Sequence, residues 1–305
     1  MATALTSGAV QRQRRQPRTF VLPAVAAVGI AAMAATAWTI AKSQTLVWPT
    51  EMAFWNAATG LAWIGAGIFI WRGRPTSPMG PLAAGYGFAY VGYALSASTD
   101  RLEFTLGMTA WAATIVASAY VYLAVPNGRL ESRLERWFMA TFALCAAGLW
   151  LGILAVSQVL PAAGGEIECA TRCPHNAIQL VSGHTGVGRA LATALALVLA
   201  LLAIGVAMFV FSKARSPSRL RRRTMTPLAV GVILEVIAFV SQLILPPVYP
   251  GAKQAVLIAT YLAGLAIPAA LLLGLASGRA FAARSLGRIA MSASETPMTP
   301  VACRT

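Results

Sequence analysis

The chain has 305 residues, of which 58% are apolar and only 11% are charged. A soluble domain carries roughly 25% charged residues, so this composition is typical of a polytopic membrane protein and leaves no room for a soluble domain of ordinary size. The net charge of +15 does not indicate nucleic-acid binding, because the basic residues gather in alternate loops between apolar segments.

Hydropathy predicts eight membrane spans, since a spanning helix needs about 20 mainly apolar residues. The predicted spans are Phe20–Ala41, Met52–Trp71, Pro81–Ser98, Phe104–Val125, Trp137–Val159, Ala190–Phe211, Pro227–Leu245 and Gln254–Ala276. They predict one all-α transmembrane bundle over residues 20–276, between a basic segment at 1–19 and a tail at 277–305. The first apolar run, at roughly 22 residues, exceeds the 7–15 of a signal-peptide core, which favours an uncleaved first span.

The basic residues predict the orientation of these spans. If the N-terminus lies in the cytoplasm, 19 of the 24 Lys and Arg residues fall on the cytoplasmic side, as the positive-inside rule requires. Both termini are then cytoplasmic, and the protein is expected in the plasma membrane. The cluster at Lys213–Arg223 is interpreted as an orientation signal that contacts anionic headgroups, so the lipid bilayer is the main expected partner.

The turn after the fourth span reads Pro126-Asn127-Gly128-Arg129. Proline presets φ, and the Asn-Gly pair tolerates the left-handed conformation that a tight turn needs. The arginine is expected to hold this turn at the cytoplasmic face.

The fifth span contains Gly148 and Gly152, which are four residues apart. Small residues at this spacing let helix backbones approach closely. The pair favours packing within one bundle, with a homodimer as the alternative.

The segment 160–189 is the one long outer loop. Cys169 and Cys173 lie in it, and the oxidising side of the membrane favours a disulfide between them, or else free thiols. A metal site that adds His175 and His184 is the alternative. The spacing C-x₃-C-x-H-x₈-H is not a common zinc pattern, so no metal is predicted.

The placement of the two histidines, His175 and His184, argues against most membrane enzymes. Neither lies in a predicted span, whereas haem and di-iron chemistry and intramembrane proteolysis need imidazoles near the bilayer. Ser182-Gly183-His184 resembles one element of membrane phosphatases of the phosphatidic-acid type, but the second catalytic histidine of that family has no counterpart downstream. We therefore expect no enzymatic activity and no cofactor.

Glu235 is the only acidic residue well inside a predicted span. It lies eight residues after Pro227, about 12 Å along the helix, and a carboxylate at that depth costs on the order of 3 kcal/mol. Gln242 lies seven residues further on, on the same helical face. This pair is the candidate sensing switch, and a protonated or hydrogen-bonded structural residue is the alternative.

Three short motifs resemble one known family. Trp71–Gly80 resembles the "R-x-P-x-N-P-I-G" turn, and Ala124–Arg133 is similar to the "F-P-D-G-R-L-x-S-R" turn, of multi-pass actinobacterial sensor histidine kinases. Cys173-Pro174-His175-Asn176 resembles the "C-P-x-N-P" element of their outer loop, and Arg279–Val301 resembles the start of their linker. The resemblance implies the membrane sensor region of such a kinase.

The chain lacks the phospho-accepting histidine and the ATP-binding elements that follow the linker in that family. The resemblance therefore implies a signal-transduction module without a kinase core, either a truncated kinase or a separate protein that acts through a cytoplasmic kinase or response partner. The alternative function is a small secondary transporter that uses Glu235 as its coupling carboxylate, although the paired broken helices of such transporters are not evident. A structural scaffold is a third interpretation.

Overall fold

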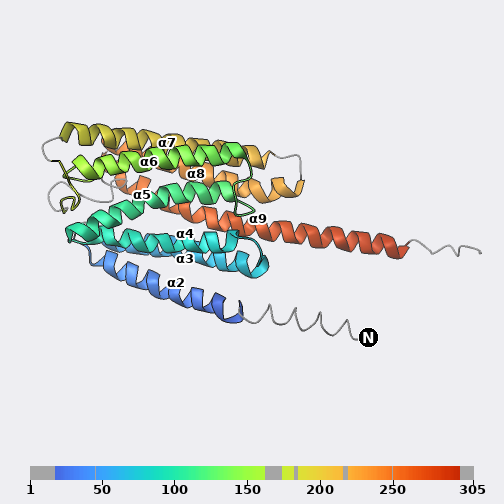
Figure 1. The fold of residues 1–305 in the computed structure, drawn as a ribbon. Coiled ribbons are helices and arrows are strands. Elements are labelled where there is room, and N and C mark those ends of the chain that lie inside the picture. The colour runs from blue at the N-terminus through green and yellow to red at the C-terminus, as the bar shows by residue number, and fades with distance from the viewer. Residues whose placement is uncertain are drawn as a thin grey trace, which may run out of the picture.

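The computed structural model describes residues 18–44, 46–161, 174–181, 185–215, 219–248 and 250–295, which form an all-helical bundle (Figure 1). The long helices in these ranges are α2 (Arg18–Ala41), α3 (Pro49–Gly73), α4 (Met79–Tyr93), α5 (Arg101–Ala124), α6 (Arg133–Val156), α7 (Thr185–Ala214), α8 (Arg219–Val248) and α9 (Lys253–Glu295). There are also two 3₁₀ helices in these ranges: η1 (Ala94–Ala97) follows α4, and η2 (Pro250–Ala252) precedes α9. The predicted all-α fold class is confirmed.

Seven of the described helices are long and apolar enough to cross a membrane, which indicates a multi-pass membrane protein. The exception is α4, whose 15 residues extend about 22 Å, less than the roughly 30 Å of a hydrocarbon core. The four residues of η1 add about 8 Å at the rise of a 3₁₀ helix. An eighth span would thus need α4 and η1 together.

Helices that follow one another along the chain pack side by side. In Figure 1, α2, α3 and α4 form one side of the bundle, α6 and α7 form the other, and α5, α8 and α9 lie between them. α9 packs against both α8 and α3, and it continues as one helix that projects beyond the bundle (Figure 1). We call the end from which α9 projects the basic end, because the α3–α4 and α5–α6 turns there carry Arg72, Arg74, Arg129 and Arg133.

The long described helices all begin earlier than hydropathy predicts, and capping explains two of these starts. α6 begins at Arg133, about one turn before the predicted start at Trp137, because Ser132 and Glu135 form a capping box. In the same way α5 begins directly after Asp100, whose carboxylate accepts hydrogen bonds from two backbone N–H groups of the first turn. These first turns are polar and are stabilised by capping hydrogen bonds. A hydropathy window measures apolar residues only, so it places the helix starts too late.

The outer surface of the bundle is strongly apolar. Trp137, Leu144 and Leu151 lie at seven-residue spacing on one face of α6, and their side chains are 64–75% exposed. A continuous apolar face of this kind is rare on a soluble monomer. It is the face that a lipid environment covers.

Small residues set the closest helix contacts. A Cβ atom on Gly67 of α3 would collide with the backbone of Ala84 in α4, so these two helices touch through their backbones. In the predicted Gly148–Gly152 pair, a Cβ on Gly152 would lie 3.2 Å from the Leu191 side chain of α7, whereas Gly148 faces open space. Gly152 therefore allows close packing of α6 on α7 inside the bundle, and the homodimer stays a prediction.

Candidate functional site

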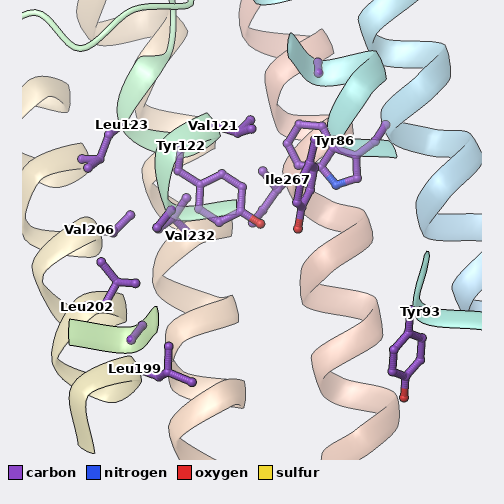
Figure 2. Close-up of a cluster of buried hydrophobic side chains, with 14 of the residues drawn as sticks. Tyr86, Tyr93, Val121, Tyr122, Leu123, Leu199, Leu202, Val206, Val232 and Ile267 are labelled. Atoms are coloured by element: carbon purple, nitrogen blue, oxygen red, sulfur yellow. The ribbon is translucent and has the colours of Figure 1, made fainter. Parts of the chain in front are cut away.

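A cavity of about 170 Å³ lies among α3, α4, α5, α7, α8 and α9. We call it the central pocket. Leu199, Leu202 and Val206 of α7 form an apolar part of its wall (Figure 2). The rest of the lining is mainly aromatic and polar, which is unusual for the interior of an apolar bundle.

Tyrosines occupy one side of the central pocket. The side chains of Tyr86 (α4) and Tyr122 (α5) extend toward one another from different helices (Figure 2). The Tyr86 hydroxyl lies 3.3 Å from that of Tyr90, one helical turn further along α4. The Trp63 ring of α3 packs against the rings of Tyr86 and Tyr122, with centroid distances of 5.0 Å and 6.1 Å. These ring contacts fix the positions of the hydroxyl groups.

Three further side chains in the lining carry buried polar atoms that have no hydrogen-bond partner within the described residues. Asn56 and Thr59 of α3 are 1% and 2% exposed, and neither the amide of Asn56 nor the hydroxyl of Thr59 is paired within the described protein. Oε2 of Glu235 on α8 is likewise buried and unpaired. Because each unpaired buried polar group costs about 1–3 kcal/mol, their gathering around one cavity indicates a binding site.

Both residues of the predicted switch line the central pocket. The Glu235 carboxyl interacts with the Tyr122 hydroxyl. Gln242 donates a 2.9 Å hydrogen bond from its amide to the hydroxyl of Thr260 on α9. Gln242 therefore joins α8 to α9 at the pocket, while the switch function itself stays a prediction.

Sequence reasoning missed Asn56, Thr59 and the tyrosines. Asn56 and Thr59 are three residues apart, and the tyrosines at 86, 90 and 93 follow the same helical spacing of three and four. This spacing places each set on one helix face. Polar stripes on two different predicted spans were thus the signal that could have revealed the pocket.

The outer-loop candidates are only partly described. Cys169, Cys173 and His184 lie outside the described residues, and His175 is exposed. Asn176 is buried, and its amide nitrogen donates to the carbonyls of Leu154 and Ser157 at the end of α6, at 2.6 and 2.9 Å.

Asn176 also accepts a 3.0 Å hydrogen bond from the backbone N–H of Ile178. Its side chain therefore satisfies carbonyls that the end of α6 leaves unpaired. This is a structural function for one residue of the outer-loop motif.

The predicted cytoplasmic turn lies at the basic end. Gly128 has φ +76°, and a Cβ there would collide with the backbone of Met79, so this turn packs on the α3–α4 turn. The side chain of Asn127 donates a 2.8 Å hydrogen bond to Glu131, Pro126 follows a cis peptide bond, and Arg129 is exposed. The structure thus brings the α5–α6 turn against the start of α4.

The prediction that the Lys213–Arg223 cluster contacts lipid headgroups is wrong for Lys213. Its side chain is buried, forms a 3.1 Å ion pair with Glu135 and donates to the carbonyl of Leu123. The second carboxylate oxygen of Glu135 accepts from the backbone N–H groups of Glu131 and Ser132, at 2.9 and 3.5 Å. This cluster joins the ends of α5, α6 and α7 at the basic end.

The described residues define an all-helical protein with several membrane-length helices and a pocket, lined by polar, aromatic and aliphatic side chains, among six of its helices. Within these residues, no group of three or more His, Cys, Asp or Glu side chains is placed to hold a metal ion. Comparison with protein-family models, curated proteins and solved structures finds no match to the chain. The function is therefore inferred from the pocket and from its connection to α9.

Proposed function

We propose that this protein is a sensory module of the plasma membrane, in which the central pocket receives a signal and α9 transmits it to a cytoplasmic partner. The main support is that α9 contributes Thr260, Tyr261 and Gly264 to the pocket and continues without a break to Glu295. From Gly264 to Glu295 the helix extends about 46 Å at 1.5 Å per residue. A change at the pocket therefore acts directly on a helix that leaves the bundle.

The distribution of charge supports the orientation in this proposal. The basic end carries the arginines of the α3–α4 and α5–α6 turns, and α9 projects from the same end (Figure 1). Under the positive-inside rule this end faces the cytoplasm. With α4 and η1 together as the eighth span, both termini are cytoplasmic, and the projecting part of α9 is available to a kinase or response partner.

The resemblance to sensor histidine kinases supports the same function. The two turns that carry the resemblance contact one another through Gly128 and Met79, at the end where α9 projects. In the family, the corresponding tail is the linker to the kinase core. We propose that α9 beyond residue 276 has the equivalent function in this chain.

A substitution that fills the central pocket tests this proposal without a known ligand. A Cβ on Gly264 has no atom within 4 Å, so Gly264→Leu places a side chain in the cavity without a backbone collision. We expect hydrogen exchange of the α9 amides at 277–295 to change about threefold, because a shift of under 1 kcal/mol in a two-state equilibrium produces such a change. The measurement is hydrogen–deuterium exchange mass spectrometry in lipid nanodiscs.

The matched control is Gly65→Leu on α3. A Cβ on Gly65 also meets open space, but this residue is exposed and does not line the pocket. The control should leave exchange at 277–295 unchanged. If Gly264→Leu folds and exchanges like the control, the pocket does not communicate with the projecting helix and the sensory proposal is wrong.

A secondary transporter is the second candidate, because the unpaired oxygen of Glu235 lies in a pocket lined by six helices. A coupling carboxylate needs such a position near the middle of the bundle. Uptake into proteoliposomes with and without a pH gradient separates the two candidates. Accumulation that requires the gradient and is lost in Glu235→Gln would favour transport over sensing.

A further inference from the structure

We propose that the central pocket binds a small organic cation, a protonated amine about the size of one aromatic ring, with Glu235 as its counter-ion. This inference rests on the proposed function, in which the pocket is the receiving site. It goes beyond that proposal because it names the chemical class of the signal.

The charges around the pocket point to a cation. Glu235 is the only acidic residue in the lining, and none of the lining residues of the described chain is basic. Its buried Oε2 has no hydrogen-bond partner among the described residues, which therefore offer this oxygen no cation. An ammonium group would pair with it directly, and such a charge-assisted hydrogen bond is stronger than one between neutral groups. An anionic ligand would be repelled by the same carboxylate.

The aromatic lining points to the same class. Tyr86, Tyr90, Tyr122 and Trp111 all contribute to the wall, and Figure 2 shows Tyr86 and Tyr122 approaching from different helices. The faces of tyrosine and tryptophan rings attract cations, most strongly where water is excluded. A carboxylate among aromatic rings therefore favours an amine over a neutral molecule of equal size.

Asn56 and Thr59 indicate that the ligand carries a second polar group. Both are almost fully buried and unpaired, and they lie on α3, whereas Glu235 lies on α8. The amide of Asn56 can both donate and accept, and the Thr59 hydroxyl can do the same. A hydroxyl or carbonyl group on the ligand would satisfy them while the ammonium group contacts Glu235.

The volume limits the size of the ligand. The cavity measures about 170 Å³, and an apolar cavity of about 150 Å³ accepts benzene. One ring with short substituents therefore fits this volume. A phenol with an aminoethyl substituent, tyramine, combines the ring, the hydroxyl and the ammonium group, and it is a suitable probe.

The test measures binding of tyramine and of its neutral analogue 4-ethylphenol to the full chain in nanodiscs of zwitterionic lipid, with empty nanodiscs subtracted. Trp111 lines the pocket, so quenching of tryptophan fluorescence reports occupancy, and calorimetry provides the affinity. We expect tyramine to bind at least about tenfold more tightly than 4-ethylphenol, since cation–π contacts and a desolvated ion pair act on tyramine alone. Equal affinities, or no binding of tyramine, would overturn the proposal.

Glu235→Gln tests the counter-ion, with Glu51→Gln as the matched control. Glu51 lies in the first turn of α3, is exposed and does not line the pocket, so its loss removes one carboxylate without changing the site. Glu235→Gln should weaken tyramine binding about tenfold or more and leave 4-ethylphenol unchanged, while the control changes neither. If Glu235→Gln does not fold, the comparison of the two ligands on the native protein still decides the proposal.

The two proposals fail separately. If tyramine does not bind but Gly264→Leu alters exchange in α9, the ligand class is wrong and the sensory function stands. If tyramine binds through Glu235 but Gly264→Leu leaves α9 unchanged, the amine site stands and the sensory function is wrong.

Discussion

Two buried polar clusters differ in how their hydrogen-bonding groups are satisfied. At the basic end, both carboxylate oxygens of Glu135 and the ammonium group of Lys213 have partners. In the central pocket, Asn56 and Thr59 and one oxygen of Glu235 have none within the described protein. A fully paired cluster fixes the ends of helices, whereas an unpaired one destabilises the fold unless something binds it. The first cluster therefore stabilises helix ends, whereas the second supports the binding site that we propose.

The largest effect is expected at the paired cluster. Lys213→Met should lower the free energy of unfolding by about 3–5 kcal/mol, because it leaves the buried carboxylate of Glu135 without its counter-charge. The measurement is an SDS titration in bicelles followed by circular dichroism. Lys253→Met provides the control, since Lys253 is exposed, and it should change stability by no more than about 0.5 kcal/mol.

The double variant Lys213→Met with Glu135→Gln sharpens this result. The amide oxygen of Gln can still accept from the backbone N–H groups that Glu135 now caps, and no unpaired charge remains. Most of the lost stability should therefore return. A double variant as unstable as Lys213→Met alone would show that packing around Lys213, rather than its charge, holds the three helix ends.

Replacing each of two buried asparagines by leucine tests the difference between paired and unpaired polar groups. Asn176 is buried with its hydrogen bonds made, so Asn176→Leu should destabilise the protein by about 2–3 kcal/mol. Asn56 is buried with none, so Asn56→Leu removes a desolvation cost and should stabilise it by about 1 kcal/mol. Unfolding titrations of both variants measure the difference. If both variants lose stability equally, the Asn56 side chain stabilises the fold. Its amide is then not an unpaired polar group that a ligand would satisfy.

Composition was sufficient for the fold class, but not for every helix. Long apolar runs predict α2, α3 and α5 to α9 because a spanning helix has no alternative to internal hydrogen bonds. They also predict a span at Pro81–Ser98, where the α-helix stops at Tyr93 and a short 3₁₀ helix follows. η1 packs so closely on α5 that a Cβ on Gly107 would collide with the backbone of Ser96, and hydropathy carries no information on such packing.

The sequence predicts a site residue only where its polarity differs sharply from that of its neighbours in the chain. Glu235 is conspicuous because it is an isolated acid in an apolar span, and Gln242 follows at helical spacing. Lys213 was interpreted as part of a basic loop because its partner Glu135 lies 78 positions earlier in the chain, and only the fold brings them together. Asn56 and Thr59 were missed because single neutral polar residues are common in membrane helices.

The smallest predicted effect concerns the hydrogen bond that joins α8 to α9 at the pocket, between Gln242 and Thr260. Gln242→Leu removes the donor to Thr260 and should cost about 1 kcal/mol, because Thr260 keeps its own bond to the carbonyl of Val256. Gln254→Leu is the control, since Gln254 is exposed and its amide lies 3.3 Å from the carboxylate oxygens of Glu51, and it should have almost no effect. Unfolding titrations compare the two. If Gln242→Leu costs as little as the control, α8 and α9 are held together by apolar packing alone, and a signal at Glu235 would have to reach α9 through the ligand rather than through Gln242.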